Sequence, residues 1–149
     1  MIFPVGRGAG PRSVDEYVVR VGGTAEVLSE SEFAAWVRAH QSDYPDQERV
    51  DELLRRGLLV RVDDVNTFAQ QYRLLPLYIG LGNRPDDPEQ FAIGLPGLGP
   101  LAVVPATTYE LWQWGWVAPS LGVLGSIDGV LEGVSALLAD FVAVLDPVS

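Results

Sequence analysis

Hydrophobic residues cluster in four short segments that have the length and composition of strands. Residues 17–21 and 25–28 form one pair, and residues 91–93 and 101–104 form another. Each pair is rich in valine, leucine or aromatic side chains, and a glycine-containing turn separates its members. This pattern is typical of β-hairpins. We therefore expect two hairpins, one in each half of the chain.

A helix is expected directly after each hairpin. Ser29 and Glu32 have the Ser/Thr-x-x-Glu spacing of a capping box, and so do Thr107 and Glu110. In a capping box the hydroxyl and the carboxylate each accept a hydrogen bond from a free backbone N–H of the first helical turn. The two motifs therefore predict where these helices begin.

Hydrophobic periodicity predicts a second helix in each half. Residues 46–56 form the first, and Gly57 is expected to end it before a strand at 58–62. Residues 129–139 form the other, with an apolar stripe along one side. Residues 141–145 either continue that helix or form a strand, and the pattern leaves both readings open.

The two halves resemble each other along the chain. Residues 3–10 match residues 75–82 at an offset of 72, with a proline and spaced glycines in each. The matching aromatic residues that follow are Tyr17 with Phe91, Phe33 with Tyr109, and Trp36 with Trp112. Few positions are identical, so chance similarity is the alternative, but the order of elements favours an internal duplication.

These elements together predict an α+β fold of two similar subdomains, each a β-hairpin with helices, packed about a pseudo-twofold axis. We place the first subdomain at residues 1–63, a linker with a short helical turn at 64–74, and the second subdomain at 75–149. The glycine-rich segments 6–10 and 80–82 are expected to be structural turns, because neither has the spacing of a dinucleotide-binding loop.

The order hairpin, helix, helix and strand is similar to that of winged-helix domains. With the segment LLRRGLLV at residues 53–60, it resembles the small PqqD-like peptide-recognition domains. The resemblance covers residues 15–62 and, less closely, 89–145. It implies that a leader peptide binds by adding a strand to a sheet edge. The glycine-rich segments are not usual in that family.

Charge narrows the classes of partner. The 149 residues carry a formal net charge of −10, and every basic residue is an arginine in residues 1–84. Residues 85–149 contain eight acidic residues and no basic one. Such a field repels nucleic acid. The sequence also shows no signal peptide or membrane span, so we expect a cytoplasmic protein with no nucleic-acid or membrane partner.

Few residues suggest catalysis or metal binding, and we expect no cofactor. His40, the single histidine, is either a general base or a solvated imidazole at a helix end, and we favour the second. Asp86, Asp87 and Glu89 suggest a hard-cation site, but a solvated acidic turn fits their spacing better. The absence of cysteine excludes thiolate sites and disulfides.

Tryptophan supplies the candidate binding residues. We take Trp36, Trp112, Trp114 and Trp116 as candidates for a protein interface, because interface hot spots are enriched in tryptophan. The alternative is that the cluster at 112–116 packs in the core between the two halves, with an indole N–H bonded to a carbonyl. On a helix, Trp112 and Trp116 would share one face.

We therefore predict a non-catalytic protein- or peptide-binding module and leave homodimer formation open. One alternative is a winged-helix transcriptional regulator, for which Arg49, Arg55 and Arg56 form the only basic cluster. Another is a small enzyme that uses carboxylates such as Asp15 and Glu16 or the pair at 86–87. The acidic charge opposes the regulator, and no spacing favours the enzyme.

Overall fold

The computed structural model describes residues 1–124 and 129–148. Seven elements make up the first half: β1 (Ile2–Pro4), β2 (Arg7–Pro11), β3 (Glu16–Val21), β4 (Thr24–Ser29), α1 (Glu30–Ala39), α2 (Gln47–Arg55) and β5 (Leu59–Arg61). Helix α3 (Val65–Gln71) follows. The second half contains β6 (Tyr72–Pro76), β7 (Ile79–Asn83), β8 (Gln90–Gly94), β9 (Pro100–Pro105), α4 (Ala106–Trp114), the 3-10 helix η1 (Leu121–Val123), α5 (Val130–Ala139) and β10 (Ala143–Pro147). The expected α+β class is confirmed.

Strand pairing follows one scheme in both halves. Strands β2-β3-β4 form an antiparallel sheet, as do β7-β8-β9, and the first and last strands of each half pair as β1-β5 and β6-β10. Helices α1 and α4 lie at an offset of 76 residues, and α2 and α5 match at an offset of 84. We call positions related by these offsets, or by 72 for β2 and β7, corresponding positions. Descent of the halves from one duplicated segment remains a prediction.

The expectation that both glycine-rich segments are turns was wrong, because they form strands β2 and β7. The register of β2 shifts between Gly8 and Gly10, and that of β7 shifts between Gly80 and Gly82. Gly10 and Gly82 have φ angles of +96° and +83°. A glycine with positive φ is typical of one common type of β-bulge. The spaced glycines thus bend an edge strand in each half.

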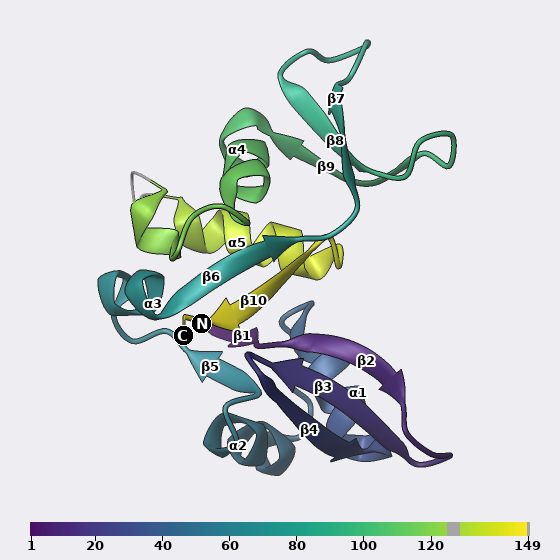
Figure 1. Ribbon diagram of the computed structural model, residues 1–149, viewed down its shortest axis with the longest axis vertical. Helices are drawn as coiled ribbons and strands as arrows, with labels where there is room; N and C mark the ends of the chain where they lie inside the picture. Colours follow the sequence, from purple (N-terminus) through teal and green to yellow (C-terminus); the bar gives the residue numbers. More distant parts are fainter. Residues whose placement is uncertain (125–128, 149) are drawn as a thin grey trace.

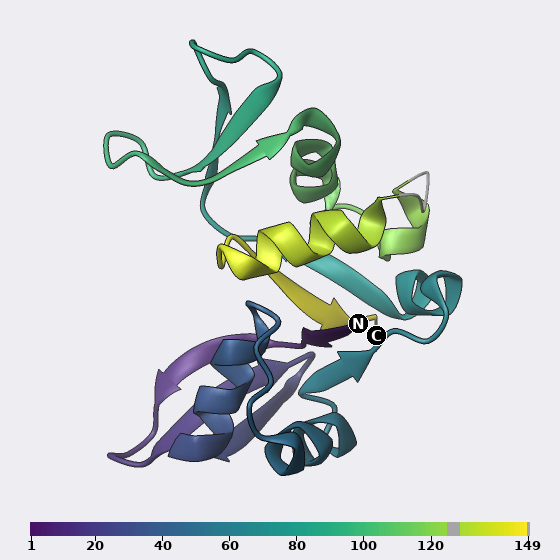
Figure 2. The ribbon, with the colours of Figure 1, turned by 180° about the vertical axis from the view of Figure 1, so that it is seen from behind.

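The two halves extend in opposite directions from a central group of strands. Figure 1 shows β1-β5 and β6-β10 in the middle, with the two three-stranded sheets towards opposite ends of the long axis and the termini close together. The view from behind shows the same arrangement (Figure 2). Hydrogen bonds join the halves here, from Gly6 N to Leu145 O at 2.7 Å and from Gly22 N to the Asp146 carboxylate at 2.8 Å.

Residues 64–74, the expected linker, contain helix α3 and the start of strand β6. Asp64 caps α3 by accepting a hydrogen bond from Thr67 N, and Phe68 and Ala69 of this helix are buried. The ring of Phe68 lies 5.7 Å from that of Phe3 on β1. The main hydrophobic cluster therefore combines α3 and β1 with the sheet and helices of the second half. A second cluster fills the space between α1, α2 and the β3-β4 hairpin.

The predicted helix ends are partly correct. The capping box of Ser29 and Glu32 is present at α1. The one predicted at Thr107 is wrong, because α4 begins directly after Pro105 and has no side-chain cap. Residues 143–147 form strand β10, which settles the choice left open above. Phe141 follows α5 with a φ of +57°. It stands at the position that corresponds to Gly57, which follows α2 with a φ of +76°.

Candidate functional site

A chain of three aromatic rings ties the first helix of each half to its sheet. Trp36 and Trp112 end these chains, are only 4% and 6% exposed, and donate indole hydrogen bonds to Val5 O at 3.0 Å and Val142 O at 2.8 Å. The ring pairs are Tyr17–Phe33 (4.3 Å), Phe33–Trp36 (5.6 Å), Phe91–Tyr109 (4.8 Å) and Tyr109–Trp112 (5.6 Å). These two interface candidates are therefore core residues whose indoles do not lie on the surface.

The other two candidates are on the surface. Trp114 and Trp116 are 54% and 63% exposed, and Val117 beside them is also exposed. The expected shared face of Trp112 and Trp116 is not formed, because α4 ends at Trp114. The chain turns at buried Gly115, where a Cβ atom would lie 2.6 Å from Leu74 O of β6. The backbone of β6 thus approaches Gly115 closely, between the two exposed tryptophans.

The first half has no indole at the position that corresponds to Trp114. The corresponding residue on α1 is Arg38, whose guanidinium lies 2.8 Å from the Asp43 carboxylate. Both side chains of that pair are more than half exposed. The same backbone position thus carries a solvated ion pair in one half and an exposed tryptophan in the other.

A groove of about 320 Å³ lies beside Trp114, between α4 and α5. The helices cross closely at Gly133, where a Cβ atom would lie 2.9 Å from Leu111 Cδ2. Leu111 and Val130 supply apolar lining, and Trp114 forms part of one wall. The groove therefore depends on a glycine that lets the two helices approach.

One charged side chain lines this groove among the described residues. It is Glu110, which lies one helical turn before Trp114 on α4 and is exposed. The hydroxyls of Thr107 and Thr108 complete the polar part of the lining. The groove thus combines an apolar floor, an aromatic wall and a carboxylate, and we call it the α4–α5 groove.

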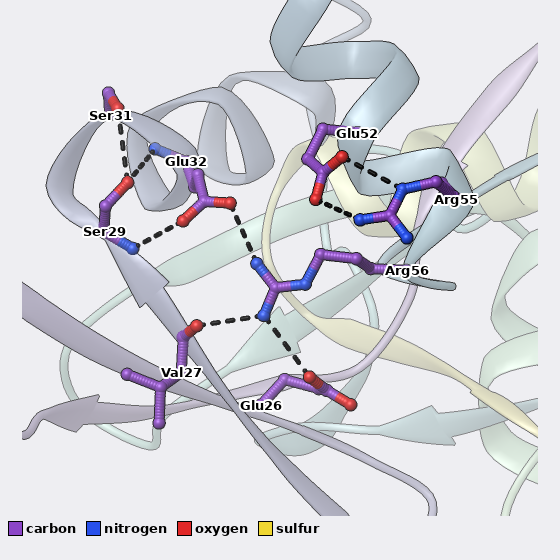
Figure 3. A network of polar contacts seen from close by, with 8 residues as sticks. All are labelled: Glu26, Val27, Ser29, Ser31, Glu32, Glu52, Arg55 and Arg56. Atoms are coloured by element: carbon purple, nitrogen blue, oxygen red, sulfur yellow. Dashed lines mark hydrogen bonds and ion pairs between the residues drawn. The ribbon is translucent and has the colours of Figure 1, made fainter.

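The arginine cluster of the first half is occupied by internal ion pairs. Arg56 donates to Glu32 at 2.8 Å, to Val27 O at 2.9 Å and to Glu26 at 3.3 Å (Figure 3). Arg55 pairs with Glu52 at 2.6 Å. These contacts join α2 to α1 and β4 and neutralise two of the three arginines that a nucleic-acid interface would need. Nothing in their geometry favours the regulator.

Glu32 has two structural partners in this network. Its carboxylate accepts a hydrogen bond from Ser29 N at 2.9 Å and one from Arg56. Burial raises the pKa of Glu32, but the hydrogen bonds from Ser29 and the charge of Arg56 outweigh burial, so the pKa lies below its ordinary value. Glu32 is therefore an ionised structural carboxylate, unlike a general acid.

His40 is buried, and the expectation of a solvated helix-terminal imidazole was wrong. Its Nδ1 donates to Trp36 O at 3.0 Å, and its ring packs between Trp36 and Phe141. Burial lowers the pKa of His40, and the hydrogen bonds to the carbonyls of Trp36 and Val37 offset only part of that effect. This burial is not visible in the local sequence pattern, because Phe141 lies 101 residues away.

The acidic segment between β7 and β8 is an exposed turn. Arg84 donates to Asp86 at 3.2 Å and lowers its pKa, and Asp87 accepts a hydrogen bond from Glu89 N at 3.2 Å. Within residues 1–124 and 129–148, no group of three or more His, Asp or Glu side chains is arranged to hold a metal ion. No helix in this part of the chain has the length and apolar character needed to cross a membrane.

Comparison with known proteins found no relative. No family model matches the sequence, and neither the curated proteins nor the solved structures contain a match. The geometry of the described residues therefore carries the functional argument alone.

Proposed function

We propose that this protein is a non-catalytic module that binds a protein or peptide through the aromatic surface formed by Trp114, Trp116 and Val117 with the adjoining α4–α5 groove. The observation that carries this proposal is the exposed indole of Trp114 at a position where the first half holds the solvated Arg38–Asp43 pair. Trp114, Trp116 and Val117 are three exposed apolar side chains within four residues, and a group of this kind is a candidate for contact with a partner.

The distribution of exposed apolar side chains along the chain supports the proposal. Among the described residues, most of the large exposed ones lie between residues 78 and 123. Covering a large apolar side chain stabilises a complex by roughly 1.5–3 kcal/mol when burial is complete. Trp114 and Trp116 together thus offer enough area for an interface anchor.

Side-chain recognition fits the second half better than strand addition. Strand β9 pairs only with β8 among the described strands, but prolines occupy both of its ends, and proline weakens pairing at an edge. Strand β4, the other hairpin edge, contains no proline. The strand addition that the PqqD-like resemblance implies is therefore better suited to β4.

A displayed library of random twelve-residue peptides, selected against the full chain, tests this function. We expect enriched peptides that lose binding to Trp114→Arg, a variant that copies the residue of the first half. Val14→Ser is the matched control, since Val14 is almost fully exposed in the loop between β2 and β3. Absence of any enriched peptide, or equal binding to the Trp114→Arg variant, would contradict the proposal.

A further inference from the structure

We propose that the α4–α5 groove accepts an arginine side chain of the bound polypeptide. This inference rests on the proposed function and specifies the chemistry of its partner. The guanidinium would lie against the Trp114 indole and the Glu110 carboxylate, and the aliphatic part of the side chain would cover Leu111 and Val130.

The charge of the groove selects a cation. Glu110 is the one charged residue among the described residues of the lining, and no base of this chain neutralises it in the described contacts. Glu132 of α5 stands nearby, with its Oε2 atom 3.9 Å from the position of a Cβ built on Gly129. Residues 85–149 contain no basic residue at all. An anionic ligand would meet repulsion here, and a cationic one would be attracted.

The aromatic wall selects arginine among cations. Glu110 and Trp114 lie four residues apart on α4, so they share one face of the helix. A guanidinium is planar, stacks on an indole and pairs with a carboxylate through a fixed fork of donors. Its methylene groups pack on apolar surface while the charged end stays polar. Each part of an arginine side chain thus has a matching feature in the groove.

The corresponding positions of the first half lack these properties, because Glu110 and Trp114 correspond to Ala34 and Arg38. A separate groove, between the start of α1 and α2, is lined by Glu32, Glu48, Asp51 and Glu52 together with Arg49 and Arg55. Arg55 already pairs with Glu52, and Glu32 already pairs with Arg56. Internal cations therefore already pair with two of the four carboxylates that line that groove. The α4–α5 groove differs because its carboxylate stands beside an exposed indole with no internal cation.

The test uses an end-capped hexa-arginine peptide and, as its uncharged counterpart, a hexa-citrulline peptide, both at about 0.15 M salt. Binding is followed through the indole N–H resonances of the four tryptophans, with Trp114 assigned by its loss in Trp114→Arg. We expect hexa-arginine to shift the Trp114 resonance and hexa-citrulline to leave it unchanged. Glu110→Gln should weaken binding by roughly three- to tenfold. Glu89→Gln removes an exposed charge from the β7–β8 turn and should change affinity less than about twofold.

The selected twelve-residue peptides separate failure of this inference from failure of the proposed function. Enrichment of arginine among peptides that require Trp114, with loss of affinity in Glu110→Gln, supports the inference. Peptides that require Trp114 but contain no excess of arginine and bind Glu110→Gln normally would overturn it and leave the binding function standing. Hexa-arginine that binds wild type, Glu110→Gln and Trp114→Arg equally would also overturn it.

Discussion

The imidazole of His40 stacks on the ring of Phe141, with centroids 4.6 Å apart and planes inclined by 19°. This contact joins the end of α1 in the first half to the turn between α5 and β10 in the second. Trp36 packs edge-on against the same imidazole at 4.7 Å. A titratable group thus lies buried where the two halves meet.

Protonation of His40 should destabilise the fold. Burial places its folded-state pKa below the ordinary value of 6.5, so the unfolded chain binds a proton that the folded chain resists. Above about pH 6.5 His40 is neutral in both states and has no effect on the free energy of unfolding. As the pH drops below that value, the free energy of unfolding falls by at most about 1.4 kcal/mol per pH unit. Urea unfolding at pH 7.5 and 5.5 measures this loss.

A His40→Gln variant isolates the histidine from the carboxylates. It should be less stable than wild type at pH 7.5 but should lose less stability between pH 7.5 and 5.5. Equal losses in both proteins would show that His40 does not titrate in this window.

Loss of Arg56 should destabilise the first half. In Arg56→Met the partly buried carboxylates of Glu26 and Glu32 and the carbonyl of Val27 lose a charged donor. We expect a loss of about 1–3 kcal/mol in the free energy of unfolding, measured by denaturant titration. Arg55→Ala is the matched control, because the Arg55–Glu52 pair is solvent-exposed, and its midpoint should stay near that of wild type. Equal effects of the two changes would contradict the network in Figure 3.

Gly80→Ala should be far more destabilising than Gly8→Ala at the corresponding position. A Cβ at Gly80 would overlap the Tyr109 hydroxyl and lie 3.2 Å from Trp112 Cζ3. A Cβ at Gly8 would lie 3.7 Å from the nearest atom, on Trp36, which is an ordinary contact. Overpacking of this kind costs roughly 1–3 kcal/mol.

The same comparison predicts a rescue. The residue corresponding to Tyr109 is Phe33, which has no hydroxyl. Tyr109→Phe should therefore recover much of the stability lost in Gly80→Ala. A double-mutant cycle measures this recovery as the interaction energy between the two substitutions. Additive effects would mean that the hydroxyl does not cause the clash.

Trp114→Arg should leave the fold intact. Arg38 occupies the corresponding position on α1, and Trp114 is more than half exposed, so we expect the free energy of unfolding to stay within about 0.5 kcal/mol of wild type. A loss above about 2 kcal/mol would make Trp114 a structural residue and remove the basis of the proposed function.

Several local elements of this protein can be predicted from neighbouring residues in the chain. The hairpins, the capping box at Ser29, the helix stop at Gly57 and the excess of acid after Arg84 all follow from residues near one another in the chain. The turns, the cap and the helix stop depend on hydrogen bonds and φ angles within a few residues, which residue type constrains directly, and the acidic excess is a property of composition alone.

Burial of individual side chains depends on the packing of elements that are distant in the chain. Trp112 and Trp114 are two residues apart, yet one indole is in the core and the other on the surface, because the sheet lies on one side of α4. His40 is buried by Phe141, and the glycine-rich segments become strands by pairing with β3 and β8. Burial and pairing are set by residues distant in sequence, and a local pattern does not contain that information.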